Sequence, residues 1–264
     1  MAKPTGKARF VVHSPETIAG IRDAARATTE VLRELSRQVQ PGVTTLMLDQ
    51  LAGQLIRSQG GESAFLGYRG YPGQVCISVN DEVVHGIGRA DRVLASGDLV
   101  GLDVGVRLKG CIGDTAATIC AGGRPAPLAA RLLSATQAAL DAAIAAARGG
   151  VDVSEIGRAV EKVVKAAGFA VVRDFVGHGC GRDLHEPPEV PNFTTPVRGV
   201  SLRPGMVLAL EPMVNVGGWR VTVDRDDGWT VRTADGSLSA HFEHLVLITE
   251  GNAEVLTCPK TPSE

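Results

Sequence analysis

The sequence predicts an α+β fold in which two helices followed by antiparallel strands occur twice along the chain. Three observations predict this class. Segments near residues 15–39 and 128–147 have the composition and apolar spacing of helices, and Val, Ile and Leu alternate with polar residues from about 75 to 119, as in antiparallel strands. The third observation is a repeat, because glycines and apolar residues of two helices recur at one common offset in the second half of the chain.

Composition argues against several classes of function. The chain has 264 residues, 44% of them hydrophobic, and a formal net charge of −2. This length supports one large domain or two small ones with a sizeable core, and the charge offers no basic surface for nucleic acid. Residues 1–13 contain no apolar stretch like that of a secretory signal, and no apolar run approaches the roughly 18 residues that would cross a bilayer. We expect a cytoplasmic protein with no nucleic-acid or membrane partner.

The cysteines are typical of a reducing compartment. There are five, at positions 76, 111, 120, 180 and 258, and no two form a Cys-x-x-Cys pair. An odd number without such pairs predicts neither a thiolate zinc site nor a disulfide framework. Reduced, structural thiols fit the cytoplasm.

The first helical pair has clear boundaries. Residues 14–16, Ser-Pro-Glu, supply an N-cap, a first-turn proline and an early acid, which predicts a helix to about Val39. Residues 41–42, Pro-Gly, end it, and a second helix follows with apolar side chains at helical spacing over 48–56. The glycines at 60–61 end that helix.

The helical pair recurs in the second half of the chain. An alanine-rich helix is predicted over 128–147, and another between Gly150 and Gly168. Gly42 precedes the corresponding first-half helix and Gly60 follows it, and the offset from Gly42 to Gly150 equals that from Gly60 to Gly168. Two unrelated helices could share some apolar positions, so the glycines at both ends carry most of the argument for an internal duplication.

The duplication predicts the domain organisation. We expect an N-terminal segment, 1–13, and then a single domain, 14–264, with pseudo-repeats at about 14–122 and 124–256. The second repeat should end in strands from about 206 to 248. Because nothing between the repeats resembles a flexible linker, we expect them to share one sheet and one core.

Two aspartates lie in apolar, strand-like sequence of the first half. Asp103 falls within a predicted buried strand, and Asp114 follows a plausible hairpin turn at 108–110, so a hairpin would place both carboxylates side by side. A single aspartate more often serves in a turn. Two unpaired buried carboxylates, however, cost several kcal/mol unless their charge is compensated. A bound metal would compensate both.

A second set of polar residues follows. His178 is flanked by glycines, which allow close backbone approach and unusual dihedral angles, and His185 lies seven residues later. A lone histidine is more often a satisfied core residue than a ligand, but two in one glycine-rich stretch favour a site. Glu211 and Glu243 lie in apolar, strand-like runs, where a position on the solvated surface is a weak explanation for an acidic side chain. His85 is likewise flanked by apolar residues and glycine.

Together these side chains predict a metal centre. Four carboxylates and one imidazole form an oxygen-rich site that can hold two divalent ions about 3.5–4 Å apart. The absence of sulfur ligands favours Mn²⁺, Fe²⁺ or Co²⁺ over a structural zinc, while Zn²⁺ and Ni²⁺ stay open as the native metal. The expected ligands are Asp103, Asp114, His178, Glu211 and Glu243.

The motifs, taken in order, resemble one enzyme family. Any one of them is weak evidence, but the ordered set covers residues 14 to 256 and is specific. The matching stretches are Gly67-Tyr-Arg-Gly-Tyr-Pro, Cys76-Ile-Ser-Val-Asn, Val83-Val-His-Gly-Ile, Asp103 through Gly113-Asp114-Thr115-Ala116, Gly177-His-Gly-Cys-Gly-Arg, His185-Glu-Pro-Pro, Glu211-Pro-Met-Val-Asn, and Asp227-Gly-Trp-Thr-Val through Glu243-His244. The chain resembles the methionine aminopeptidases of the pita-bread metallopeptidase family, which also includes prolidase and aminopeptidase P.

The resemblance implies a pseudo-symmetric pita-bread fold, a curved antiparallel sheet backed by helices. Prolidase and aminopeptidase P carry a substantial additional amino-terminal domain, for which we expect no room before residue 14. The short stretch from His178 to Glu211 lacks the helical insertion of the type II enzymes, and no cysteine/histidine zinc module precedes the helices. The bacterial type I enzymes are the best match.

The resemblance also implies a role for each ligand. Asp114 and Glu243 would bridge the two metals, Asp103 would complete one metal site, and His178 and Glu211 the other. The substrate's free α-amino group would bind near the metal held by Asp103, which makes the enzyme an aminopeptidase rather than an endopeptidase.

Three residues would act on the reaction itself. By the resemblance, water acidified by the metals attacks the carbonyl of the first peptide bond, and Glu211 relays its proton. His85 would hydrogen-bond the scissile amide and assist departure of the new amine. His185 would stabilise the tetrahedral oxyanion, as a preorganised donor does.

The resemblance further implies a methionine pocket. Aromatic residues usually pack in cores, but Tyr68, Tyr71 and Trp229 lie in glycine-rich, loop-like segments that favour a pocket. The pocket residues would be Phe65, Tyr68, Tyr71, Cys76, Leu184 and Trp229, with His85 and His185 beside the bound substrate.

Several residues depart from the family's common pattern. We expect these departures to alter the shape of the pocket, and to touch no metal ligand. They are Phe65 in place of a frequent Cys, Arg69 for His, Cys111-Ile112 for a Tyr-His pair, Leu184 for an aromatic residue, His241 for Gln and Leu245 for Thr. Asn80 and Ser239 match positions that hold a monovalent cation in some relatives, a weak signal.

The expected activity is removal of the N-terminal methionine from nascent proteins and peptides, with a preference for a small second residue. The partners would be the N-termini of nascent chains near the ribosome, and the enzyme would act as a monomer. One alternative is an X-Pro peptidase of the same fold, which the missing amino-terminal domain disfavours. Another is a binding protein of this fold that has lost catalysis, although such a protein would lack the ligands that are present here.

Overall fold

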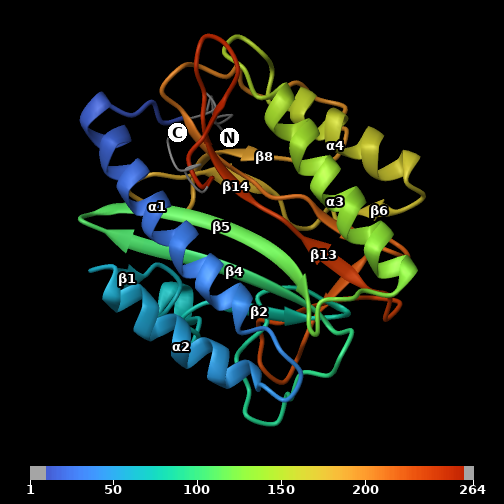
Figure 1. Cartoon of the computed structure of the whole chain (residues 1–264). Coiled ribbons are helices and arrows are strands. Elements are labelled where there is room, and N and C mark those ends of the chain that lie inside the picture. Colours follow the sequence, from blue (N-terminus) through green and yellow to red (C-terminus); the bar gives the residue numbers. More distant parts are fainter. Residues whose placement is uncertain (1–9, 259–264) are drawn as a thin grey trace, which may run out of the picture.

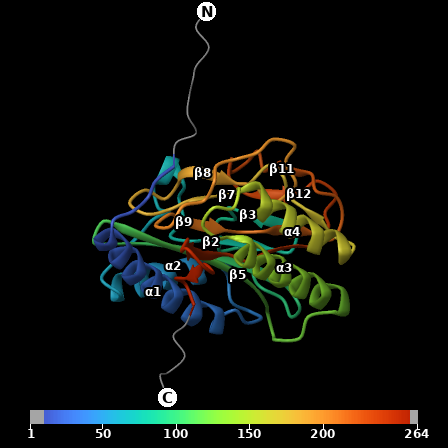
Figure 2. The same ribbon diagram turned by 90° about the horizontal axis from the view of Figure 1, so that it is seen from above.

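The computed structural model describes residues 10–258, so most of the predicted N-terminal segment and the last six residues lie outside it. Four helices occur in two pairs, α1 (Pro15–Arg37) with α2 (Thr45–Ser58) and α3 (Pro127–Ala146) with α4 (Ser154–Ala166). Seen from above, the helices lie on one side of the strands (Figure 2). None of the helices in the described part is long and apolar enough to cross a membrane.

The predicted signals set the helix boundaries. The Ser14 side chain accepts a hydrogen bond from the Thr17 N–H at 3.2 Å, and Pro15 is the first helical residue of α1. The helix ends at Arg37, two residues before the expected Val39. Thr44 caps α2 in the same way, an N-cap that the sequence argument did not identify.

The strands of the first half centre on a long hairpin. β4 (Leu99–Leu108) and β5 (Cys111–Cys120) pair along their whole length, and the turn between them has left-handed backbone at Lys109 (φ 50°) and Gly110 (φ 79°), as the predicted tight turn requires. β4 also pairs with β1 and β2. The remaining elements are β1 (Glu62–Ser63), the 3₁₀ turn η1 (Tyr68–Gly70), β2 (Cys76–Val79) and β3 (Glu82–Val84).

The strands of the second half form a five-stranded sheet in the order β15-β14-β9-β7-β8 and contribute to two smaller sheets, β13-β10-β6 and β11-β12-β3. Strands were expected only from about residue 206, but three of them lie earlier, between 170 and 190. The strands are β6 (Ala170–Val171), β7 (Gly177–Gly179), β8 (Glu186–Val190), β9 (Val207–Leu210), β10 (Met213–Asn215), β11 (Val221–Val223), β12 (Val231–Thr233), β13 (Ser239–His241), β14 (His244–Leu247) and β15 (Glu254–Val255).

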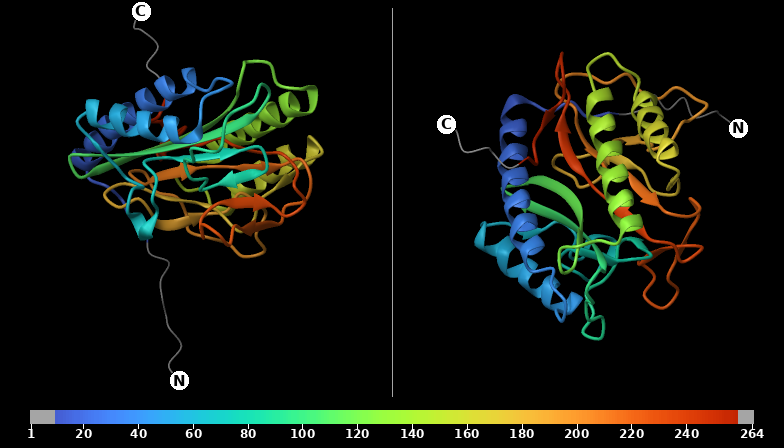
Figure 3. Two further views of the ribbon diagram at one scale, coloured as in Figure 1. Left: turned by 90° about the horizontal axis from the view of Figure 1, so that it is seen from below. Right: turned by 45° about the vertical axis from the view of Figure 1, so that its right-hand side comes forward.

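The internal duplication extends to individual hydrogen bonds. The Gly42 N–H donates to the Leu94 carbonyl at 2.8 Å, and at the equivalent position of the second repeat the Gly150 N–H donates to the Leu202 carbonyl at 2.8 Å. Both glycines have left-handed backbone, with φ of 88° and 82°. Figures 1 and 3 show the two helical pairs over the same face of the strands, α1 and α2 towards one edge and α3 and α4 towards the other. The boundaries at 14–122 and 124–256, and the single domain over 14–264, stay predictions.

The two halves meet where β5 lies against the segment between β13 and β14. The Glu243 N–H donates to the Ala116 carbonyl at 2.9 Å, and the Thr115 hydroxyl donates to the Glu243 carbonyl at 2.7 Å. The Thr118 hydroxyl donates to the His241 carbonyl at 2.9 Å. Backbone of the second half is thereby held directly on the central hairpin of the first.

The buried side chains form more than one cluster in the described residues. One cluster lies among α1, α2 and the β4 strand and includes Leu48 and Leu102, and another lies under α3 and α4 and includes Leu132 and Ile156. A third combines residues of both halves, among them Phe65, Leu184 and Leu245. This third cluster packs beside the site described next.

Candidate active site and metal centre

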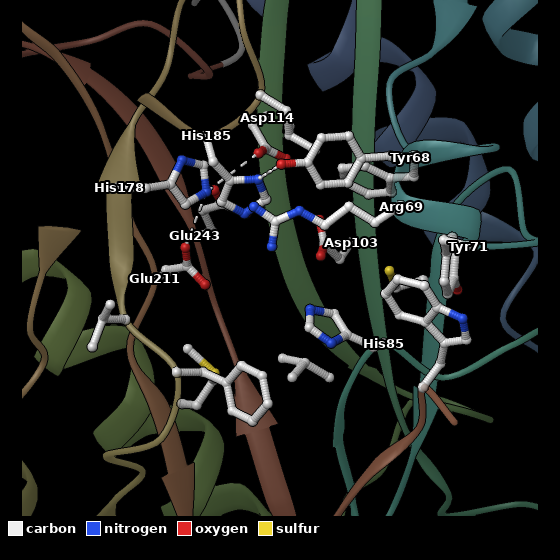
Figure 4. A pocket seen from close by; sticks show the side chains of 18 of the residues that line it. Tyr68, Arg69, Tyr71, His85, Asp103, Asp114, His178, His185, Glu211 and Glu243 are labelled. Carbon is white, nitrogen blue, oxygen red and sulfur yellow. Dashed lines mark hydrogen bonds and ion pairs between the residues drawn. The ribbon is translucent and has the colours of Figure 1, made fainter. Parts of the chain in front are cut away.

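A cavity of about 340 Å³ brings together every residue that the sequence singled out for ligation, catalysis or substrate binding. Figure 4 shows the polar members directed towards one another from strands of both halves. The cavity is lined by Phe65, Tyr68, Tyr71, Cys76, His85, Asp103, Asp114, His178, Leu184, His185, Glu211, Trp229 and Glu243, among others.

The β4–β5 hairpin places the two aspartates on one face of the sheet. Asp103 lies opposite Ala116, and Asp114 lies opposite Gly105, so the aspartates are diagonal neighbours across the pair of strands. On the other side of β4, Cys76 of β2 lies opposite Asp103. The side-by-side carboxylates expected from the hairpin are therefore present.

His178 lies in the middle of β7, between two close neighbouring strands. A Cβ on Gly177 would lie 2.4 Å from the Ala209 carbonyl oxygen, and one on Gly179 would lie 2.7 Å from that of Pro187. The glycines are thus needed for close approach, as expected. The expected unusual dihedral angles are not found, because neither glycine has left-handed backbone.

The two glutamates lie at breaks between strands rather than within strands. Glu211 immediately follows β9, and Glu243 lies between β13 and β14. The offset from Asp103 to Glu211 is the same as that from Gly42 to Gly150, so these two acids occupy corresponding positions in the two repeats. A break lets a side chain turn out of the regular alternation of a strand and into the cavity.

The ligand atoms converge. The Nε2 atom of His178 lies 3.3 Å from Oε1 of Glu211 and 3.9 Å from Oδ2 of Asp114. One ligand atom each of Asp114, His178 and Glu243 fall within 4.8 Å of one another. A further oxygen of Asp114 and one of Asp103 are buried without a hydrogen-bond partner among the described residues.

Burial changes the ionisation of this cluster. Desolvation raises the pKa of Asp103 to about 7. Desolvation, and then the charges of neighbouring carboxylates, raise the pKa values of Asp114, Glu211 and Glu243 well above their usual range. Like charges so close together are unfavourable without a cation among them.

His178 presents a lone pair to these carboxylates. Its Nδ1 atom lies 2.9 Å from the Gly179 carbonyl oxygen, which can only accept, so Nδ1 carries the proton. Burial lowers the pKa of His178 to about 3, which keeps the ring neutral. Nε2 then presents its lone pair to the oxygens of Glu211 and Asp114. An interposed divalent cation resolves this contact, and the set of oxygen donors with one imidazole suits such a cation.

His85 lies on the apolar side of the cavity. It has left-handed backbone (φ 60°), an uncommon conformation that is frequent at functional sites. Its ring meets Phe175 and Trp229 edge-on, with centroids 5.3 and 6.3 Å away. Burial, followed by the charge of His185, lowers the pKa of His85 to about 4, so it is neutral at pH 7.

His185 lies at the mouth of the cavity against Tyr68. Its Nδ1 atom is 2.9 Å from the Tyr68 hydroxyl, the two rings stack at 5.3 Å, and its ring centroid is 4.1 Å from that of His178. Burial, and then the nearby charge of Arg69, lower the pKa of His185.

The Glu186 carboxylate binds the backbone of the loop that precedes His185. One oxygen of Glu186 accepts the backbone N–H groups of Arg182 and Asp183 at 2.9 and 3.1 Å. Its other oxygen lies 3.2 Å from Nε2 of His13, and both of these side chains are nearly buried. The His13 ring fills the space over Gly181, where a Cβ would come within 2.2 Å of it.

The apolar part of the cavity is rigidly built. The Tyr71 hydroxyl lies 2.7 Å from the Gly86 carbonyl and 3.1 Å from that of Val75, so its polar atom is used and its ring faces the cavity. Trp229 meets that ring edge-on at 5.2 Å. The Phe65 ring lies on Gly105, where a Cβ would come within 2.4 Å of it.

Several residues that line the cavity were not predicted from the sequence. They are Val84, Asp174, Phe175, Val176, Glu189 and Met213. Phe175 carried a usable signal, because an aromatic residue in a sequence with only 4% of them lies two residues before the Gly-His-Gly stretch.

One expectation about the departures is wrong. His241 does touch a predicted ligand, since its Nε2 atom lies 3.8 Å from Oε2 of Glu211 and is buried with no hydrogen-bond partner in residues 10–258. Asn80 and Ser239 are adjacent, with the Ser239 N–H donating to the Asn80 carbonyl at 2.8 Å. Binding of a monovalent cation there stays a prediction.

Comparison with known proteins agrees with this geometry. The model of metallopeptidase family M24 matches residues 19–250. Methionine aminopeptidase 1 of Bacillus subtilis is 41% identical over 248 residues, covering 94% of this chain and 99% of the relative. Methionine aminopeptidase of Escherichia coli is 42% identical over 250 residues, 94% of each chain.

Solved structures confirm the predicted α+β pita-bread fold. Methionine aminopeptidase from Thermotoga maritima has a TM-score of 0.91 and 41% identity, covering 94% of this chain and 99% of that one. Prolidase from Pyrococcus furiosus shares the fold at 22% identity and a TM-score of 0.76, covering 95% of this chain but 66% of its own. On family model, sequence and structure alike, the chain belongs to metallopeptidase family M24, among the bacterial type I methionine aminopeptidases.

Proposed function

We propose that this protein hydrolyses the first peptide bond of new proteins and peptides to release methionine, in the cytoplasm and close to the ribosome, with a preference for a small second residue. The relatives above are methionine aminopeptidases. The observation that carries the proposal is the cavity, in which converging carboxylates and a neutral histidine face a pocket walled by aromatic rings.

Two divalent cations fit the polar side of the cavity, held by Asp103, Asp114, His178, Glu211 and Glu243. When bound, such ions act as Lewis acids and lower the pKa of water from 15.7 towards about 7. Asp114 of β5 and Glu243, between β13 and β14, lie where the two halves meet, and they would help to hold the cations there. Mn²⁺, Fe²⁺, Co²⁺, Ni²⁺ and Zn²⁺ are the candidates.

Glu211 is the proton carrier in this proposal. Its carboxylate lies beside His178 and faces the cavity, and burial raises its pKa. A carboxylate at this position can take a proton from the attacking water and return it to the departing amine. His241, 3.8 Å from the other oxygen, limits how far Glu211 can turn away.

The two remaining histidines act on the peptide. His85 is neutral at pH 7, so it can exchange one hydrogen bond with the scissile amide without adding charge. His185 is held by Tyr68 at 2.9 Å and next to His178, where an N–H donor would meet the developing oxyanion. Both would be oriented before the substrate binds.

The apolar wall accepts the methionine side chain. Thioether sulfur makes favourable contacts with the edges of aromatic rings. Tyr71 and Trp229 meet edge-on, and the Tyr71 hydroxyl is directed to backbone carbonyls. On the other side of His85, Phe175 narrows the space for the second residue. A small second residue would fit there, and a bulky one would not.

The test is release of methionine from Met-Ala-Ser by chelator-treated protein, with each candidate metal added back singly. Restored turnover of Met-Ala-Ser, with little on Met-Lys-Ser, Ala-Ala-Ser or Gly-Pro, is expected. Preferential cleavage of Gly-Pro would indicate an X-Pro peptidase. Binding of methionyl peptide without turnover under any metal would indicate a binding protein.

A further inference from the structure

Among the described residues that line the cavity, Arg69 is the one with a permanent positive charge. It lies in η1, at the rim, and its side chain is exposed. Figure 4 shows it reaching inward from the side of Tyr68 towards the polar residues. The other charged side chains along the rim, Asp174 and Glu189, are acidic.

The turn that contains Arg69 places its guanidinium group over the Tyr68 ring. Arg69 has left-handed backbone (φ 50°), and so do Gly67 and Gly70 of the same turn. The Gly70 N–H donates to the Gly67 carbonyl at 3.1 Å. This turn lays the guanidinium carbon 5.2 Å from the centroid of the Tyr68 ring, within range of a cation–π contact. The side chain therefore loses less freedom on binding a ligand than a free arginine would.

The guanidinium group has no carboxylate partner in the part of the chain that the structure describes. Among residues 10–258 no acidic oxygen lies within 4.0 Å of it, whereas Arg22 pairs with Glu254 at 2.6 Å and Arg232 with three acids. A planar group with five N–H donors, held in place at the mouth of a substrate cavity, is suited to bind an incoming carboxylate.

Arg69 lies at the rim beside the group that is proposed to meet the scissile carbonyl. The Tyr68 ring over which it lies also binds His185, and the charge of Arg69 contributes, after burial, to the lowered pKa of His185. In the proposed reaction His185 meets the scissile carbonyl. Methionine occupies the apolar wall and a small second residue the space beyond His85, so the third residue is the first whose side chain reaches the rim.

We propose that Arg69 is a specificity-determining residue that favours substrates with a carboxylate side chain at the third position, Met-small-Asp or Met-small-Glu. The inference rests on the proposed function. The guanidinium would donate hydrogen bonds to that carboxylate, and a lysine at the same position would be repelled. A partly exposed pair of this kind changes kcat/KM by about two- to fivefold, the equivalent of about 0.5–1 kcal/mol, and salt weakens it.

The experiment measures kcat/KM for Met-Ala-Glu-Ala, Met-Ala-Gln-Ala and Met-Ala-Lys-Ala, all with amidated C-termini so that no terminal carboxylate competes. Met-Ala-Ala-Glu amide tests the fourth position. The variants are Arg69→Gln and Arg69→Lys. Lys109→Gln is the matched control, because Lys109 is also an exposed cation with φ of 50°, but lies in the β4–β5 turn and does not line the cavity.

Support would be a preference for Glu over Gln and over Lys at the third position in the wild type and in Lys109→Gln. The preference should be lost in Arg69→Gln, partly kept in Arg69→Lys, and reduced in roughly 1 M salt. Equal rates for Glu and Gln in the wild type, an equal or larger preference at the fourth position, or an undiminished preference in Arg69→Gln would each overturn the proposal. Failure to release methionine from all the peptides would instead contradict the proposed function.

Discussion

His13 and Gly181 should be energetically coupled. A Cβ on Gly181 would lie 2.2 Å from Cε1 and 2.4 Å from Nε2 of His13, and 3.1 Å from Oε1 of Glu186. Gly181 does not have left-handed backbone, so alanine is strained there only by this contact. Gly181→Ala must therefore displace the His13 ring from Glu186, and overpacking of this kind costs about 1–3 kcal/mol.

His13→Ala removes the same ring. Glu186 then loses its partner at 3.2 Å but keeps two backbone N–H donors, so we expect a loss of about 1–3 kcal/mol in the free energy of unfolding. In the double variant the added methyl group occupies space that the ring has left. The decrease in the free energy of unfolding should therefore be smaller in the double variant than the sum of the two single-variant decreases, by about 1–2 kcal/mol.

Urea unfolding of the four proteins, at pH 7 and with one fixed metal concentration, measures this coupling. Gly101→Ala provides the control, because its Cβ would meet its nearest neighbour at 3.5 Å, an ordinary contact, and it should add to His13→Ala without coupling. Additivity of the His13 and Gly181 changes within about 0.5 kcal/mol would refute the reasoning, as would a Gly181→Ala protein as stable as the wild type.

Three further predictions concern catalysis and pH. Chelation should abolish turnover and Mn²⁺ or Co²⁺ should restore it, with Asp114→Asn binding metal more weakly in a calorimetric titration; full activity of metal-free protein would contradict this. His85→Ala and His185→Ala should each lower kcat by about 10²–10³ while metal content stays near that of the wild type. A variant that no longer binds metal would show that the substituted histidine is a ligand and not a catalytic residue. Glu186 has a pKa below its usual 4.5, because the nearby His13 ring and the hydrogen bonds from two amides outweigh its burial; its stabilisation is present above about pH 4.5 and lost as pH falls through the folded-state value. The loss of unfolding free energy in Glu186→Gln should therefore be largest near neutral pH and shrink towards pH 3, and a loss that does not change with pH would contradict the assignment.

The repeat and the ligand types could be predicted from the sequence because both depend on local signals. Gly42 and Gly150 have matching backbone because a left-handed turn is specified by the glycine itself. Asp103 and Asp114 could be paired from the sequence alone, since a tight hairpin fixes which residues lie across from each other.

The features that could not be predicted depend on contacts between distant segments. His241 comes close to Glu211 because it lies opposite Met213 in the β10–β13 pair, two residues after Glu211, and no local pattern specifies this pairing. The strands between 170 and 190 are short and contain glycine and proline, so their alternation is too weak to recognise. Phe175 enters the cavity through its contact with His85, which belongs to the other half of the chain.

The junction of the two repeats has a consequence for how the chain could be divided. Asp103 and Asp114 belong to the first predicted repeat, whereas His178, Glu211 and Glu243 belong to the second, so neither repeat alone has the full proposed ligand set. The connection at 122–123 is a turn of two left-handed glycines, and the second has open space around it. A chain cut there would give two fragments that each expose one side of the β5 contact and hold part of the site. Divalent cation would then act as a ligand shared between fragments, and its concentration would control their reassembly.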